Sequence, residues 1–303
     1  RTHPTSSKRR RPTSPRTRRH LNMSPAPIIS FLSDYGTTDE FVGVVHSVLA
    51  DLAPQSKVID ITHGIPAYDT RAGSLALARS VEYLCPGVVL AVVDPGVGTD
   101  RRPVAVEVGG GQSVLVGPDN GLLAPAVAMV GGASRAVVLN NTAIHLAGDA
   151  TTFDGRDIFA PAVAHLTNGG DLTDLGDLID PGTLVPGVVP VAHTDSEGLH
   201  AEVLWIDQFG NAQLNIGPED LPGPSVQITV AGRPRTATQV TAFDQVGPGK
   251  LGLMVDASGL VALVVARASA AADLGLSTGD PVLITPAGQT AGTPVALTQR
   301  EEN

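Results

Sequence analysis

Apolar positions in the first half of the chain follow two alternating spacings. The runs IISFL (28–32), KVIDIT (57–62) and VVLAVV (88–93) are short and largely apolar, which is typical of buried strands. Between them, DEFVGVVHSVLADL (39–52) and RAGSLALARSVEYL (71–84) repeat apolar residues every three or four positions, as helices do. Strands that alternate with helices predict a mostly parallel sheet covered by helices on both faces.

The same pattern continues to about residue 180. PVAVEV (103–108) and SVLVGP (113–118) predict two strands joined only by GGGQ, and AVVLN (136–140) predicts another. IFAPAVAHLTNG (158–169) predicts a helix that is interrupted by Pro161, because proline cannot donate a backbone hydrogen bond.

Beyond residue 180 the pattern changes. DPGTLVPGVVPVAHTDSEG is rich in Pro and Gly, as linkers are, and short strands separated by turns follow it. The predicted fold class is an α/β amino-terminal domain with a mostly parallel sheet between helices, plus a smaller antiparallel β-barrel carboxyl-terminal domain. The expected divisions are a disordered basic tail (1–24), the α/β domain (25–180), a linker (181–198), the β-barrel domain (199–295) and a second tail (296–303).

Charge sets the first twenty residues apart from the rest. They hold eight Lys and Arg and no acid, so they are expected to be disordered, and they lack the apolar centre of a secretory signal. The favoured interpretation is an upstream extension with Met23 as the natural start, and contact with nucleic acid is the alternative. Without this segment Lys plus Arg falls from 20 to 12 against 30 acids, which gives a net charge of −18 rather than −10. This charge argues against a nucleic-acid-binding body and suits a cationic or small-molecule substrate.

Cysteine and histidine usage narrows the chemistry further. The single cysteine, Cys85, excludes an intramolecular disulfide and a multi-cysteine metal site, and is expected to be a small buried residue near a helix end. The eight histidines show no metal-ligand spacing and are expected to be structural, with His63 as the one exception to consider. No apolar run approaches the length of a membrane span, so the protein is expected in the cytoplasm.

Polar residues follow several of the predicted strands directly. Asp34, His63, Asp94 and the pair Asp119-Asn120 all lie just past strand ends. Open α/β sheets bind ligands at the carboxyl ends of their strands, so these residues predict a small-molecule site there. A carboxylate such as Asp34 can hold a ribose diol through two hydrogen bonds.

Each motif also has a purely structural interpretation. Asp39 or Thr38 can simply cap the helix that follows, and GPDNGLL (117–123) can be an Asx-type turn. DPGVGTDRRP (94–103) can be a turn with solvated arginines, and IDQFGNAQLNI (206–216) can be a hairpin. A Walker-type phosphate loop, the H-E-x-x-H zinc motif and the G-x-S-x-G elbow are all missing from the sequence.

Taken together and in this order, the motifs SDYGTTDEF, DITHGIPAYD, VDPGVGTDRRP, GPDNGLL, TFDGRDIFAP and IDQFGN resemble one family. They are similar to the SAM hydroxide adenosyltransferases, which are S-adenosyl-L-methionine (SAM) hydrolases related to the fluorinases and chlorinases. The resemblance runs from about residue 28 to about residue 288. It implies attack of water at C5′ of SAM, which gives adenosine and L-methionine with no cofactor and no metal ion. It also implies a homotrimer whose substrate lies between one subunit's amino-terminal domain and its neighbour's carboxyl-terminal domain.

The resemblance also implies roles for individual residues. Asp94, Arg101 and Asp154 correspond to the catalytic group that handles the attacking water, and Asp34 to the aspartate that holds the ribose hydroxyls. The rest of the implied substrate-binding set comprises acids near the methionine amino group, aromatic walls around the nucleoside and polar groups that read adenine and ribose: Asp39, Asp207, Tyr68, Phe153, Phe209, Asn120, Asn211 and Ser258.

The chain departs from the family pattern in two places. Asp154 stands where the family has the histidine of TFHGRD, and an aspartate beside an arginine is a weaker base. We therefore expect hydrolysis to survive, but more slowly. The family's Asn-Ser-Ser-Gly and Val-Asn patterns appear here as Asp256-Ala257-Ser258-Gly259 and Val265-Ala266. Contacts to adenine and to the methionine carboxylate are therefore expected to differ.

Two other functions stay open at this point. A halide in place of water would face the carboxylates of Asp94 and Asp154, which repel an anion, and only GGGQ stands where the fluorinase-like enzymes carry an extra loop. Both observations favour water. A SAM- or adenosine-binding protein that has lost activity is the second alternative, but a pure binder would not need the Asp94–Arg101 pair.

Overall fold

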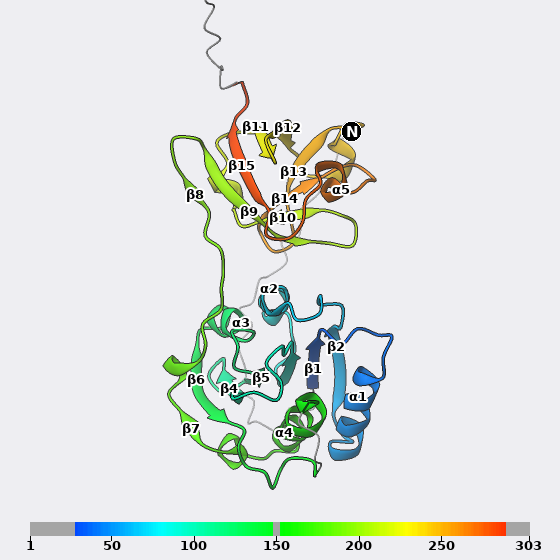
Figure 1. Ribbon diagram of the computed structural model, residues 1–303, viewed down its shortest axis with the longest axis vertical. Coiled ribbons are helices and arrows are strands. Elements are labelled where there is room, and N and C mark those ends of the chain that lie inside the picture. Colours follow the sequence, from blue (N-terminus) through cyan, green and yellow to red (C-terminus); the bar gives the residue numbers. More distant parts are fainter. Residues whose placement is uncertain (1–27, 148–151, 289–303) are drawn as a thin grey trace, which may run out of the picture.

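A seven-stranded sheet organises the amino-terminal half of the protein, and a β-barrel follows it (Figure 1). The computed structural model describes residues 28–147 and 152–288. The basic tail expected over 1–24, including Met23, and the tail expected over 296–303 lie outside the described residues. The first domain contains β1 (Ile28–Ser33), α1 (Phe41–Leu52), β2 (Lys57–Thr62), α2 (Thr70–Val81), β3 (Val88–Val92), β4 (Pro103–Val108), β5 (Ser113–Pro118), α3 (Ala124–Met129), β6 (Ala133–Val138), α4 (Ala160–Thr167) and β7 (Leu178–Ile179).

The strands of this sheet lie in the order β2-β1-β3-β5-β4-β6-β7. β1 pairs in parallel with β2 and β3, and β3 pairs in parallel with β5. β4 runs antiparallel to β5, because the short GGGQ turn between them can only form a hairpin, and it also runs antiparallel to β6. The prediction of an α/β domain with a largely parallel sheet is therefore confirmed.

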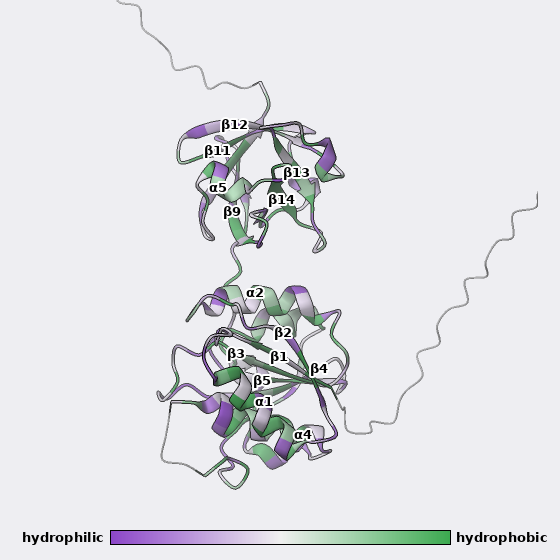
Figure 2. Ribbon diagram, turned by 90° about the vertical axis from the view of Figure 1, so that its right-hand side faces the viewer, coloured by the Kyte–Doolittle hydropathy of each residue, from purple (hydrophilic) through white to green (hydrophobic). Residues whose placement is uncertain are grey.

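Helices cover both faces of the sheet, as Figure 2 shows: α2 lies on one side of the hydrophobic strands, and α1 and α4 lie on the other. Successive residues of β3 alternate between the two cores. Leu90 packs in the cluster that contains Val45 of α1 and Val163 of α4. Ala91 packs in the cluster that contains Leu77 of α2. A strand that is buried on both faces explains the continuous apolar run of VVLAVV.

Two local predictions and one structural alternative were wrong. Pro161 does not interrupt a helix: it lies in the first turn of α4, where a missing N–H costs nothing, and a π-helical turn over Gly155–Phe159 precedes it. α1 begins at Phe41, and no side chain caps it, so neither Thr38 nor Asp39 has the capping role. Cys85 is exposed rather than buried, because it lies beyond the end of α2.

The carboxyl-terminal domain is a closed barrel of mixed strands. Its elements are β8 (His193–Thr194), β9 (Leu199–Ile206), β10 (Ala212–Leu214), β11 (Ser225–Val230), β12 (Arg233–Gln239), β13 (Leu251–Val255), β14 (Val261–Val264), α5 (Ala270–Leu274) and β15 (Pro281–Pro286). The strand order β10-β14-β13-β12-β11-β15-β9 closes through the pairing of β9 with β10, and β8 adds to β9. The barrel is not wholly antiparallel, because the connection over 240–250 crosses over and makes β12 parallel to β13.

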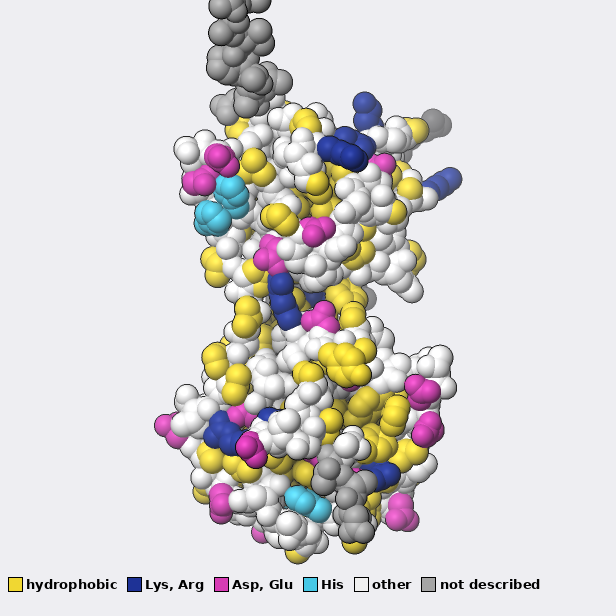
Figure 3. All heavy atoms as spheres, in the orientation of Figure 1, with side chains coloured by type: hydrophobic (Ala, Val, Ile, Leu, Met, Phe, Trp, Pro, Cys, Tyr) yellow, Lys and Arg dark blue, Asp and Glu magenta, His cyan; other side chains and the backbone are white. Residues whose placement is uncertain are grey.

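The two domains meet through α2 and β9. Arg71 of α2 forms an ion pair with Glu202 of β9, and the guanidinium of Arg79 lies 5.4 Å from the ring centroid of Trp205. Trp205 also packs against the apolar cluster around α2. Figure 3 shows the molecule narrowing at this junction, where basic and acidic side chains lie side by side. Among the described residues, none of the helices is long and apolar enough to cross a membrane.

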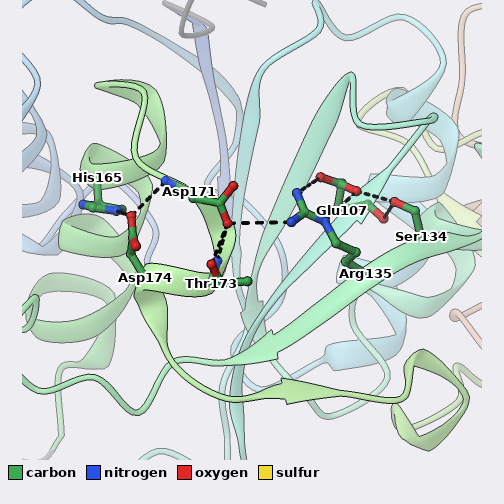
Figure 4. Close-up of polar contacts among 7 residues, drawn as sticks. All are labelled: Glu107, Ser134, Arg135, His165, Asp171, Thr173 and Asp174. Carbon is green, nitrogen blue, oxygen red and sulfur yellow. Dashed lines mark hydrogen bonds and ion pairs between the residues drawn. The ribbon is translucent and has the colours of Figure 1, made fainter.

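Figure 4 shows a polar network that ties β4 and β6 to the segment after α4. Arg135 donates to both carboxylate oxygens of Glu107, and its Nε lies 3.1 Å from Oε1. Ser134 Oγ donates to the same Oε1 at 2.6 Å. Asp171 lies 3.7 Å from the other side of the guanidinium. The Arg135 bond lowers the pKa of Glu107 below its ordinary value, although partial burial opposes this. Much of the network is solvent-exposed, so it holds the fold only weakly.

We expect Glu107→Gln to lower the free energy of unfolding by less than about 1 kcal/mol at pH 7, because the pair is partly exposed. A carboxyl whose folded pKa is lowered stabilises the protein above its ordinary pKa of 4.5, and this stabilisation is lost as the pH falls through the folded value. Denaturant unfolding of both proteins should therefore give midpoints that converge in acid. A difference that stayed constant with pH would contradict the ion-pair account.

Candidate active site

A hollow of about 340 Å³ lies at the carboxyl ends of β1 and β3. This is the edge at which a parallel sheet binds ligands. Most of the polar side chains in its walls are carboxylates, and aromatic rings form much of the rest. The carboxylates are those of Asp34, Asp39, Asp94 and Asp154, and the aromatic rings are those of Tyr35, Phe41, Tyr68 and Phe153.

Arg101 joins two of these carboxylates. Its Nε donates to Asp94 Oδ1 at 2.9 Å, and its Nη2 donates to the second oxygen of Asp94 and to Asp154 Oδ2. The exposed fractions of the three side chains are 10% for Arg101, 7% for Asp94 and 13% for Asp154. Burial lowers the pKa of Arg101, but the bonds and negative charges of Asp94 and Asp154 outweigh it, so the pKa is raised. The guanidinium therefore stays charged, and the group carries a net charge of −1.

The loop after β3 brings Arg101 back onto Asp94. Val97 N donates to Asp94 O at 3.2 Å and Thr99 N donates to Gly96 O at 3.1 Å, which closes two consecutive tight turns. Gly98 has φ +78°, a conformation that glycine adopts without strain. The alternative of a turn with solvated arginines is wrong, because Arg102 pairs with Asp119 as Arg101 pairs with Asp94.

Asp34 is tied to the loop that carries Tyr68. Tyr68 N donates to Asp34 Oδ2 at 2.8 Å, and this bond holds Tyr68 at φ +67°, an uncommon conformation outside glycine. The Tyr68 side chain is 74% exposed and forms an open wall of the hollow. Burial raises the pKa of Asp34, the bond from Tyr68 N partly opposes this, and the negative charge of Asp94 adds to the rise.

Tyr35 is a pocket residue that the sequence analysis missed. Its ring centroid lies 5.7 Å from those of Phe41 and Phe153, and these two lie 5.2 Å apart. Burial raises the pKa of Tyr35, so its hydroxyl stays neutral at ordinary pH. Its place beside Asp34 in SDYG was the available signal, but the sequence does not reveal which way the ring points.

The residues of the stretch TFDGRDIFAP divide between the hollow and a structural ion pair. Phe153, Asp154 and Gly155 line the hollow. Arg156 donates to both carboxylate oxygens of Asp157, at 2.6 and 2.8 Å, so these two residues form a structural ion pair. Asp154 and Asp157 therefore have different environments although they lie three residues apart.

The structure does not bring Asn120 into this group. Its Nδ2 donates to Val93 O at 2.9 Å, and its Oδ1 accepts from Leu122 N at 3.2 Å, so both ends of the amide bond to the backbone. This is the Asx-type turn that was the structural alternative for GPDNGLL. A role in substrate binding stays a prediction for Asn120.

The other predicted binding residues lie on the barrel. Asp207, Asn211 and Ser258 line a second hollow, of about 400 Å³. Asp207 holds the β9–β10 turn: it accepts from Phe209 N and Asn211 N at 2.9 Å and from Asn211 Nδ2 at 2.7 Å. Phe209 itself is 69% exposed. No described residue lines both hollows, so one chain divides the predicted site between its two domains.

Gly155 allows Tyr35 to pack where it does, because a Cβ at Gly155 would overlap the Tyr35 hydroxyl. We expect Gly155→Ala to lower the free energy of unfolding by about 1–3 kcal/mol through overpacking. Tyr35→Phe removes the overlapping oxygen and leaves the ring carbon Cζ at 3.2 Å, so the double variant should recover most of the loss. Thermal unfolding of the two single variants and the double variant tests this. Additive effects would show that the two residues do not interact in this way.

Comparison with known proteins agrees with this architecture. Residues 29–176 match the SAM hydroxide adenosyltransferase N-terminal domain, and residues 201–283 match the C-terminal domain of that family. An (R)-S-adenosyl-L-methionine hydrolase from Salinispora tropica is 46% identical over 263 residues, which cover 87% of this chain and 99% of that protein. A fluorinase from an Actinoplanes species is 28% identical over 64% of this chain and 73% of its own length.

A solved structure extends the similarity to three dimensions. The crystal structure of an uncharacterized conserved protein from Thermotoga maritima superposes with a TM-score of 0.78 at 30% identity. The superposition covers 85% of this chain and 99% of that one. Both domains of the chain match the family, and a relative nearly half identical spans almost its whole described length. The chain belongs to the SAM hydroxide adenosyltransferase family.

Proposed function

We propose that this protein hydrolyses SAM to adenosine and L-methionine, without a cofactor or a catalytic metal ion. The observation that carries the proposal is that Asp34, Asp94 and Asp154 line one acidic, aromatic-walled hollow, with Arg101 bonded to both Asp94 and Asp154. The named hydrolase that is 46% identical over nearly its full length supports the same reaction.

The proposed step is an in-line displacement. The oxygen of water or hydroxide forms a bond to C5′, while the C5′–S bond breaks and its electron pair goes to sulfur. Methionine leaves as a neutral thioether, so the step needs orientation and a water-poor pocket more than it needs a strong acid. When water is the nucleophile, its proton passes to a carboxylate, for which Asp154 is the proposed acceptor.

The charge of the hollow suits this substrate. Four carboxylates face it and Arg101 neutralises one of them, so a sulfonium and an ammonium enter a negative environment. Asp34 is proposed to hold the ribose hydroxyls and Asp39 to lie near the methionine amino group. Tyr68 and Phe153 are proposed to enclose the nucleoside. A halide would meet the same negative charge, which favours water as the nucleophile.

We expect the purified protein to release adenosine and L-methionine from SAM in equal amounts. Asp154→Ala should slow turnover on the order of a hundredfold, the usual contribution of a general base, and Asp154→His should keep or raise it. Chromatography of the products measures this, with Glu107→Gln as a matched control that removes a paired carboxylate away from the hollow. Unchanged turnover in Asp154→Ala would overturn the role of Asp154.

The same assay separates the alternatives. With chloride present, 5′-chloro-5′-deoxyadenosine in place of adenosine would identify a halogenase. SAM binding with no product over time would identify a binding protein.

We also propose a homotrimer in which Asp207, Phe209, Asn211 and Ser258 of one subunit complete the hollow of its neighbour. The division of the predicted site between two hollows in one chain supports this arrangement. We propose a cytoplasmic location as well, because a reducing compartment keeps an exposed thiol such as Cys85 free.

Mixing two inactive variants tests the shared site. Asp94→Asn spoils only the α/β half and Asn211→Ala only the barrel half, so in randomly mixed trimers about one quarter of the sites combine two intact halves. Coexpression should therefore restore about a quarter of the wild-type rate, whereas separately purified variants stay inactive. Failure to recover activity, with mixed trimers shown by mass spectrometry, would contradict the shared site.

A further inference from the structure

Two histidines and an aspartate converge beside β1, on three separate elements. His46 lies on α1, Asp60 on β2 and His63 directly after β2. The Nε2 atoms of His46 and His63 lie 2.9 and 3.1 Å from the same oxygen, Asp60 Oδ1. The potential ligand atoms of all three residues lie within 4.8 Å of one another.

The side chain of His63 is buried, and one of its two ring nitrogens has no hydrogen-bond partner. Its side chain is 5% exposed, and its Nδ1 is hydrogen-bonded to Ser33 Oγ at 2.7 Å. Nε2 is buried and has no hydrogen bond of acceptable geometry, although Asp60 Oδ1 is near. The oxygen therefore lies beside the direction of the nitrogen lone pair rather than along it. His46 Nε2, in contrast, is hydrogen-bonded to the same oxygen at 2.9 Å, so in this group only the buried nitrogen of His63 lacks a partner. An ion bound between the three groups would give this nitrogen a partner.

The donor atoms fit a zinc-like ion. Imidazole nitrogen and carboxylate oxygen bind Zn²⁺ at about 2.0–2.2 Å, which places tetrahedral ligands about 3.3 Å from one another. The separations of 2.9 and 3.1 Å are close to this value. Two imidazoles also favour zinc-class metals over Mg²⁺ and Ca²⁺, which prefer oxygen ligands. The Ser33 contact is the kind of outer bond that orients a metal-binding histidine.

A second group of two histidines and an aspartate lacks the buried, unpartnered nitrogen of the first group. His193, Asp195 and His200 also lie close together, on the β8–β9 hairpin. Here Asp195 Oδ1 accepts from the backbone N–H groups of Glu197 and Gly198 and contacts His200 at 2.9 Å. All three residues are solvent-accessible, so no buried nitrogen lacks a partner in this cluster. It therefore serves as the internal control.

We propose that His46, Asp60 and His63 bind one divalent transition-metal ion of the zinc class, with water as its fourth ligand. The ion joins α1, β2 and the loop after β2. That loop also bonds to the chain on both sides of Asp34: Ser33 Oγ is hydrogen-bonded to the His63 ring, and Gly36 N donates to His63 O at 2.9 Å. The ion stabilises this corner of the fold and takes no part in the reaction.

The untagged full chain, freed of metal with a chelator and titrated with Co²⁺, tests the proposal. We expect one equivalent to bind with the visible absorption of tetrahedral Co²⁺, and Zn²⁺ to displace it and raise the thermal midpoint by several degrees. His46→Gln and Asp60→Asn change partly exposed side chains, so both variants should fold. Each should weaken binding by more than about tenfold, since even outer-shell contacts contribute that much. His200→Gln should bind as the wild type does.

Two results would overturn the proposal. One is a lack of Co²⁺ and Zn²⁺ binding by the folded wild-type chain. The other is metal binding that is unchanged in both His46→Gln and Asp60→Asn. If that binding is lost in His200→Gln, the metal site lies on the β8–β9 hairpin instead. Because metal binding and unfolding are measured without SAM, failure here is independent of the proposed hydrolase activity.

Discussion

The candidate active site depends on the double ion pair of Arg101. Its guanidinium joins Asp94, at the end of β3, to Asp154, which lies 53 positions after Arg101. All three side chains are nearly buried, so each charge relies on its partners instead of on water. Loss of Arg101 would leave two uncompensated carboxylates, which is far more costly than loss of a surface pair. This contact fixes both carboxylates at the wall of the hollow.

The parallel sheet supplies the remaining geometry. β1 and β3 are adjacent and parallel, so Asp34 and Asp94 reach the same edge although they are distant in sequence. The loops at this edge are bonded to one another, as the contact from Tyr68 N to Asp34 shows. His63 ties the same corner to Ser33, one residue before Asp34. The hollow therefore has walls that the fold holds in place, as a reaction that depends on orientation requires.

Asp154, in place of the family histidine, alters both the proposed proton acceptor and the charge of the site. A histidine at this position would be neutral or cationic, whereas the aspartate gives Arg101 a second anionic partner. The result favours cationic ligands and disfavours anionic nucleophiles. It also explains why Arg101 is so strongly held: two carboxylates outweigh the cost of burying its charge.

The sequence by itself determined the elements, the two domains and the family, because apolar spacing and motif order are local properties of the chain. It also identified Asp34, Asp94, Arg101 and Asp154, which the fold brings together at one hollow. It did not reveal the parallel β12–β13 pair, the inward turn of Tyr35 or the group formed by His46, Asp60 and His63. Only the tertiary structure decided these, because strand partners and side-chain directions depend on packing between segments that are far apart in sequence. For the same reason, the sequence could not show that Asp207 and Asn211 lie at a separate hollow on the barrel.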